Sequence, residues 1–145
     1  HDIGRFKTHG PMHGWSGYIL LKRLGHPALG RGCITHWTKG RPAEEMAASP
    51  AFTESFIEKV YAALDPADWT LEDSILSVAD SSVMHTTIVS LKTRHDDLET
   101  RYGSSTWMER IKDLAFSQER EISEVLGHPV ADILGPLHGD TLDHV

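Results

Sequence analysis

The chain has 145 residues, a hydrophobic fraction of 39% and a formal net charge of −7. This is typical of one globular domain with a sizeable core, and the negative charge argues against binding of duplex nucleic acid. No apolar run approaches the roughly 20 residues that cross a bilayer, and no signal peptide is visible, so we expect no membrane partner. Because the single cysteine, Cys33, cannot form an internal disulfide, we expect a reducing, cytoplasmic location.

The first half of the chain has the apolar periodicity of α-helices. In the helix expected near Pro11, His13 and Gly17 lie on one stripe, where the glycine would let another backbone approach closely. Cys33 and His36 share a face of the next helix in the same way. The expected elements are helices over 12–24, 27–37 and 51–64, with a loop or short helix over 41–50.

The second half predicts three more helices and no strand. Thr70 and Asp73 resemble a capping box at the start of a helix whose apolar stripe includes Ile75 and Ala79. Asp80 lies at the edge of that stripe. The expected helices span 70–84, 90–102 (capped by Ser90) and 105–126, followed by a tail over about 135–145. We therefore predict an all-α protein, a compact bundle of about five to seven helices that forms a single domain over 1–145.

Histidines and carboxylates from separate segments are candidates for one metal site, since imidazole and carboxylate are common ligands of divalent transition metals. The candidates are His1, Asp2, His13, His36 and Asp80. Two alternatives stay open on spacing alone. A histidine on an apolar face can be a satisfied core residue, and an aspartate at the edge of a stripe can simply face water.

Basic residues follow these candidates along the chain. Arg5 follows the first pair, and Lys39 and Arg41 follow His36. If the pair and His36 converge, these cations would surround the site and could hold phosphate oxygens, arginine in a bidentate manner. Alternatively, Lys39 interacts favourably with the negative end of a helix dipole.

The order of these motifs resembles the HD superfamily of metal-dependent phosphohydrolases, in its HDIG-type branch. HDIGR at 1–5 resembles the family signature, and THGPMHGWSGYILLKRLG and THWTKGRP resemble the two histidine-bearing segments that follow it. TLEDSILSVADSSV resembles the helix that supplies the closing aspartate. The resemblance covers about 1–102 in the right order. The family's first histidine, upstream of the doublet, has no counterpart here, so we expect a chain truncated just before His1.

The resemblance implies an HD-like helical domain that hydrolyses a phosphate ester or anhydride of a small, nucleotide-like substrate with metal-activated water. The cofactor it implies is one or two divalent ions of Mn, Fe, Co, Ni or Zn. The implied roles are metal ligand for His1, Asp2, His13, His36 and Asp80, catalytic residue for Asp2 and Arg5, and phosphate binding for Arg5, Lys39 and Arg41.

No catalytic motif falls in 110–145, so we expect the long helix over 105–126 to be a packing or partner face, through which the chain could form a homo-oligomer. Two other functions are compatible with the sequence. One is a regulatory module that binds a nucleotide or metal without turnover. The other is a helical interaction domain whose histidines are incidental.

Overall fold

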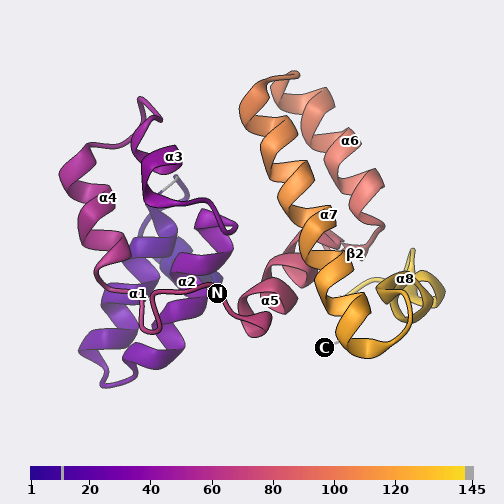
Figure 1. Cartoon of the computed structure of the whole chain (residues 1–145), viewed down its shortest axis with the longest axis horizontal. Helices are drawn as coiled ribbons and strands as arrows, with labels where there is room; N and C mark the ends of the chain where they lie inside the picture. The colour runs from indigo at the N-terminus through magenta and orange to yellow at the C-terminus, as the bar shows by residue number, and fades with distance from the viewer. Residues whose placement is uncertain (11, 143–145) are drawn as a thin grey trace. The chain divides into compact units, whose positions relative to one another are not determined.

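The computed structural model describes residues 1–10 and 12–142 and confirms the all-α prediction (Figure 1). Pro11 lies outside the described residues. The elements, in chain order, are η1 (Asp2–Phe6), α1 (His13–Arg23), α2 (Pro27–Thr38), α3 (Ala43–Ala47), α4 (Glu54–Tyr61), α5 (Leu71–Ser81), β1 (Val83–Met84), β2 (Thr87–Ile88), α6 (Leu91–Tyr102), α7 (Thr106–Leu126), α8 (Val130–Leu134) and η2 (Gly135–Leu137). The described α-helices number eight, because the short α3 and α8 add to the longer helices that periodicity predicts.

The chain divides into two compact units, His1–Asp73 and Ser74–Val145. The boundary between the two units falls within helix α5. The prediction of a single domain over 1–145 stays a prediction. Among the described residues, every helix is either too short or too polar to span a bilayer.

The core of the first unit lies between α1, α2 and α4. Tyr18, Cys33, Ile34 and Val60 form its buried centre, and aromatic side chains such as Trp37 pack around it. Helices α1 and α2 lie side by side in Figure 1, with η1 against both. The apolar faces predicted for these helices therefore meet in one core, which fixes the ends of α1 and α2 next to η1.

Glycines let η1 approach the backbone of α1 closely. A Cβ added to Gly4 would lie 1.9 Å from the carbonyl oxygen of His13 and 2.5 Å from the amide nitrogen of Gly17. A Cβ on Gly17 would lie 2.9 Å from the sulfur of Cys33. Real Cβ atoms do not come this near, so both positions require glycine. The predicted close approach at Gly17 is confirmed, and its partner is η1.

The capping box predicted at the start of α5 is confirmed. The amide of Thr70 donates to the Asp73 carboxylate at 3.0 Å, and the amide of Asp73 donates to the Thr70 hydroxyl at 3.3 Å. The same carboxylate accepts from the guanidinium of Arg31 on α2, which also donates to the carbonyl oxygens of Pro66 and Asp68. This network ties the segment before α5 to the first unit.

The apolar stripe predicted for α5 is wrong. Ile75 and Ala79 are exposed, whereas Ser74, Ser77 and Val78 are buried. The reason is that polar partners, and not hydrophobicity alone, decide which face is covered. The hydroxyl of Ser74, for example, donates to the carboxylate of Glu121 on α7.

The second unit contains the hairpin of α6 and α7, which lie side by side in Figure 1, and a small antiparallel ribbon. The prediction of no strand is wrong, because α5 ends at Ser81 and Val83–Met84 pair with Thr87–Ile88. Thr141 bridges to Thr87, and the amide of Leu142 donates to the Thr86 carbonyl at 2.7 Å. Two-residue strands are too short for periodicity to reveal. Residues 143–145 of the predicted tail lie outside the described residues.

The helix termini in the second unit follow the sequence signals. Ser90 caps α6 by accepting from the amide of Thr93 at 3.1 Å, as predicted, and Ser105 caps α7 by accepting from the amide of Met108 at 3.2 Å. Gly127 ends α7 in the left-handed conformation. Near that end Val125 is exposed, and the homo-oligomer through this helix stays a prediction.

Candidate metal centre

The short helix η1 carries Asp2 and Arg5, and His1 lies just before it. In a 3₁₀-helix, residues three apart lie on the same side, so Asp2 and Arg5 face the same way. The Nε of Arg5 lies 2.7 Å from Oδ2 of Asp2. The Nε2 of His1 lies 3.6 Å from the same oxygen, and the His1 ring packs on His36 with centroids 4.5 Å apart.

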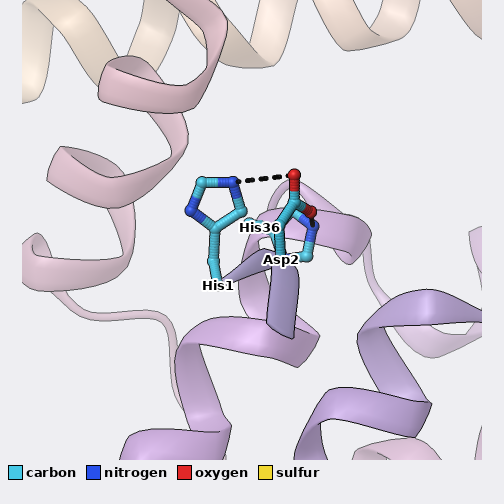
Figure 2. A group of neighbouring side chains, drawn as sticks. All are labelled: His1, Asp2 and His36. Carbon is cyan, nitrogen blue, oxygen red and sulfur yellow. Dashed lines mark ion pairs between the residues drawn. The ribbon is translucent and has the colours of Figure 1, made fainter. Parts of the chain in front are cut away.

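Two histidines from α1 and α2 meet the other oxygen of Asp2. His13 is the first residue of α1, and His36 lies in the last turn of α2; both are buried. Their Nε2 atoms are 2.9 Å apart, and Oδ1 of Asp2 lies 3.3 Å from His13 Nε2 and 3.4 Å from His36 Nε2. Figure 2 shows the side chains of His1, Asp2 and His36 together, with their ion pairs dashed.

The hydrogen bonds on the far sides of the two rings fix their tautomers. Nδ1 of His13 lies 2.9 Å from the Gly10 carbonyl oxygen, and Nδ1 of His36 lies 3.1 Å from the Gly32 carbonyl oxygen. A carbonyl can only accept, so each Nδ1 carries a proton and donates it. Each neutral ring then presents a lone pair at Nε2. Two lone pairs and a carboxylate oxygen thus converge on one point. This arrangement becomes favourable when a cation lies between them, either a metal ion or a proton on one of the rings.

The spacing of these three atoms fits a metal ion. Imidazole nitrogens and carboxylate oxygens bind zinc-like ions at about 2.0–2.2 Å, so two ligands at tetrahedral or octahedral angles lie roughly 3–3.5 Å apart. The three separations here are 2.9, 3.3 and 3.4 Å. Oδ1 of Asp2 is also buried and accepts no hydrogen bond from the described residues. The residues present therefore fit the ion that the sequence predicts.

Two further features support this fit. The donor atoms of His1, Asp2 and His36 all lie within 4.8 Å of one another, so His1 can add a ligand from the exposed side. The Nδ1 hydrogen bonds of His13 and His36 to backbone carbonyls are the outer contacts that metal-bound histidines usually make. They orient each ring with Nε2 toward Asp2. The centre is thus supported by its surroundings as well as by its ligands.

The other predicted site residues lie elsewhere in the fold. Lys39 follows α2 with a left-handed backbone, and Arg41 is buried with its Nε 3.1 Å from Oε1 of Glu45. The charge of Arg41 is therefore balanced locally, and phosphate binding by these two residues stays a prediction. Asp80 is half-buried on α5 in the second unit, and its role as a ligand also stays a prediction.

Sequence reasoning missed two parts of the centre. The first is η1 itself, because a one-turn 3₁₀-helix has no periodicity to recognise. The second is the pair of carbonyl groups from Gly10 and Gly32, which accept from the two histidine rings. In the sequence, the signal for the second carbonyl was a histidine four residues after Gly32 on one helix.

Burial raises the pKa of the nearby Cys33 thiol, which therefore stays protonated and serves the core.

Comparison with known proteins adds no family to this description. No protein-family model matches the sequence, and neither a curated protein nor a solved structure shows significant similarity to it.

Proposed function

We propose that the protein is a metal-dependent phosphohydrolase that cleaves a phosphate ester or anhydride of a small, nucleotide-like substrate, in the manner of the HD superfamily that its motifs resemble. The observation that supports this proposal is the convergence of Asp2 Oδ1, His13 Nε2 and His36 Nε2 within 3.4 Å of one another. Building such a cluster is costly unless a cation binds it.

The donor set indicates which ions the centre would hold. Imidazole nitrogens with a carboxylate oxygen suit Mn, Fe, Co, Ni or Zn better than Mg or Ca, which prefer all-oxygen sites. Such an ion, when bound, would supply Lewis acidity that favours the attack of water on phosphorus. His13, His36 and Asp2 would hold it, with His1 on the exposed side.

Arg5 gives the centre a group that recognises phosphate. Its Nε is taken by Asp2, while its side chain is 45% exposed, so N–H groups of the guanidinium face solvent beside the cluster. A guanidinium donates strongly to phosphate oxygens and keeps its charge at every physiological pH. In this proposal Arg5 would hold a phosphoryl group next to the ion, while Asp2 keeps the guanidinium oriented.

The test is hydrolysis by the purified protein of a generic phosphomonoester, a phosphodiester and a panel of nucleotides, after loading with Mn, Co, Ni or Zn. We expect metal-dependent phosphate release that Asp2→Ala lowers by more than about 100-fold, since even losing an outer-sphere partner costs roughly 10- to 100-fold. Asp113→Ala, which removes an exposed carboxylate on α7, is the matched control and should keep the activity. Protein that binds metal but cleaves nothing on the panel would contradict catalysis and favour a binding module.

A further inference from the structure

The two oxygens of the Asp2 carboxylate have different surroundings. Oδ1 is buried and faces the two Nε2 lone pairs of His13 and His36. Oδ2 faces the Nε of Arg5 at 2.7 Å and the Nε2 of His1 at 3.6 Å. A carboxylate commonly bridges two metal ions by offering one oxygen to each, yet here Oδ2 already has the guanidinium of Arg5 beside it.

We propose that the centre holds a single divalent ion, on the Oδ1 side of Asp2, and that Arg5 is a positioning residue that keeps a second ion away from Oδ2. This rests on the proposed metal site but does not follow from it, because a hydrolase of this kind works with one ion or with two. The inference assigns the number of ions and the residue that sets it.

The charge of Arg5 disfavours a second ion at Oδ2. A guanidinium does not lose its proton in proteins, so Arg5 always places a positive charge within hydrogen-bonding distance of Oδ2. A divalent ion bound to the same oxygen would lie a few ångströms from that charge, where repulsion between like charges is strong. Arg5 therefore both neutralises the charge at Oδ2 and disfavours a second ion bound to that oxygen.

Three ligand atoms gather on the Oδ1 side of Asp2. The three atoms on the Oδ1 side come from three elements, η1, α1 and α2, and their separations suit one ion. On the Oδ2 side, the Nε2 of His1 is a nearby ligand atom, 3.6 Å from Oδ2. With the Arg5 Nε 2.7 Å from Oδ2, the electrostatic field on that side disfavours a second cation.

Counting the ions bound per chain tests this directly, without any need for activity. The wild-type protein, saturated with Mn and then freed of excess metal, should hold one ion per chain by elemental analysis and by calorimetric titration. Its Mn electron paramagnetic resonance spectrum should be that of an isolated ion. Arg5→Gln keeps much of the side-chain length but removes the charge, and should bind a second, weaker ion between Oδ2 and His1.

Two control variants separate the role of Arg5 from a general effect of charge. Arg5→Lys keeps the positive charge and should still hold one ion. Lys7→Gln removes a charge from an exposed residue two positions further along the chain and should also hold one ion. A second ion in Lys7→Gln as well as in Arg5→Gln would contradict the specific contact with Oδ2.

The outcomes distinguish this inference from the proposed function. Two ions per wild-type chain, with an exchange-coupled Mn spectrum, would overturn the single-ion centre while leaving a hydrolase intact. One ion in both wild type and Arg5→Gln would overturn the role of Arg5. No ion in the wild-type chain would overturn both the inference and the metal-dependent hydrolase.

Discussion

His13 and His36 face each other with their Nε2 atoms 2.9 Å apart, and each ring donates from Nδ1 to a backbone carbonyl on its far side. The carbonyls belong to Gly10 and Gly32, which come three and four residues before the two histidines. Each ring is therefore oriented by its own local backbone before any third group arrives. The consequence is a preorganised pair of ligands that needs only Asp2 to complete a metal-binding face.

Removing one of these rings should remove most of the metal affinity. We expect His13→Ala to weaken binding of Zn or Mn by more than about 100-fold, because loss of a direct ligand costs more than the roughly 10- to 100-fold of an outer-sphere partner. Competition with a coloured chelator measures the change. His9→Ala is the matched control, since His9 is exposed on the same segment and should keep wild-type affinity. Equal affinity in the two variants would contradict the assigned ligands.

The close approach of η1 to α1 should not tolerate a side chain at Gly4. We expect Gly4→Ala to lower the free energy of unfolding by roughly 1–3 kcal/mol, as overpacking does, and to impair metal binding because η1 carries Asp2. Chemical denaturation and metal titration measure the two effects. Gly135→Ala is the control, because a Cβ there meets nothing within 4 Å. A Gly4→Ala protein with full stability would mean that η1 does not pack as described.

The ion pair between Asp73 and Arg31 should make stability depend on pH. Burial raises the pKa of Asp73, but hydrogen bonds from Arg31 and Thr70 outweigh it, and the pKa lies below its usual value. A lowered folded-state pKa stabilises the protein above the unfolded value of about 3.9, and this stabilisation is lost as the pH falls through the folded-state pKa.

We therefore expect Asp73→Asn to cost about 2 kcal/mol at pH 7, the typical worth of a hydrogen bond to a charged group. The cost should shrink as the pH falls below about 4, where the unfolded carboxyl binds a proton first, and should be lost below the lower folded-state pKa of Asp73. Unfolding by urea over a pH series measures both curves. Asp68→Asn is a suitable control, because Asp68 is exposed and accepts from Arg31 through its backbone carbonyl only. Parallel curves for wild type and Asp73→Asn would contradict the pKa shift.

The serine cap of α7 should contribute to the stability of the second unit. Ser105→Ala removes the acceptor for the amide of Met108 and should cost about 1 kcal/mol. Ser104→Ala, at the exposed neighbouring position, should cost little. Thermal unfolding measures the difference. Metal binding should be unchanged in both, because His1, Asp2, His13 and His36 all lie in the first unit.

Local signals in the sequence predicted most helices well. The ranges 12–24 and 105–126 match α1 and α7 to within a residue or so, because a stop glycine or a cap marks their ends. Prediction failed where the local signal was weak or misleading. The ribbon of β1 and β2 is too short to show periodicity, and the face of α5 that is buried is rich in serine rather than in Ile75 and Ala79.

By itself, the sequence determined the all-α class, the helix caps and the identity of the candidate ligands, because propensity, capping and residue chemistry are local properties. It did not determine that Asp2, His13 and His36 meet. Only the tertiary structure decided that, by packing η1 against α1 at Gly4 and Gly17 and by setting α1 beside α2. These contacts join residues far apart in the chain, so the convergence of the three side chains depends on the whole core of the first unit.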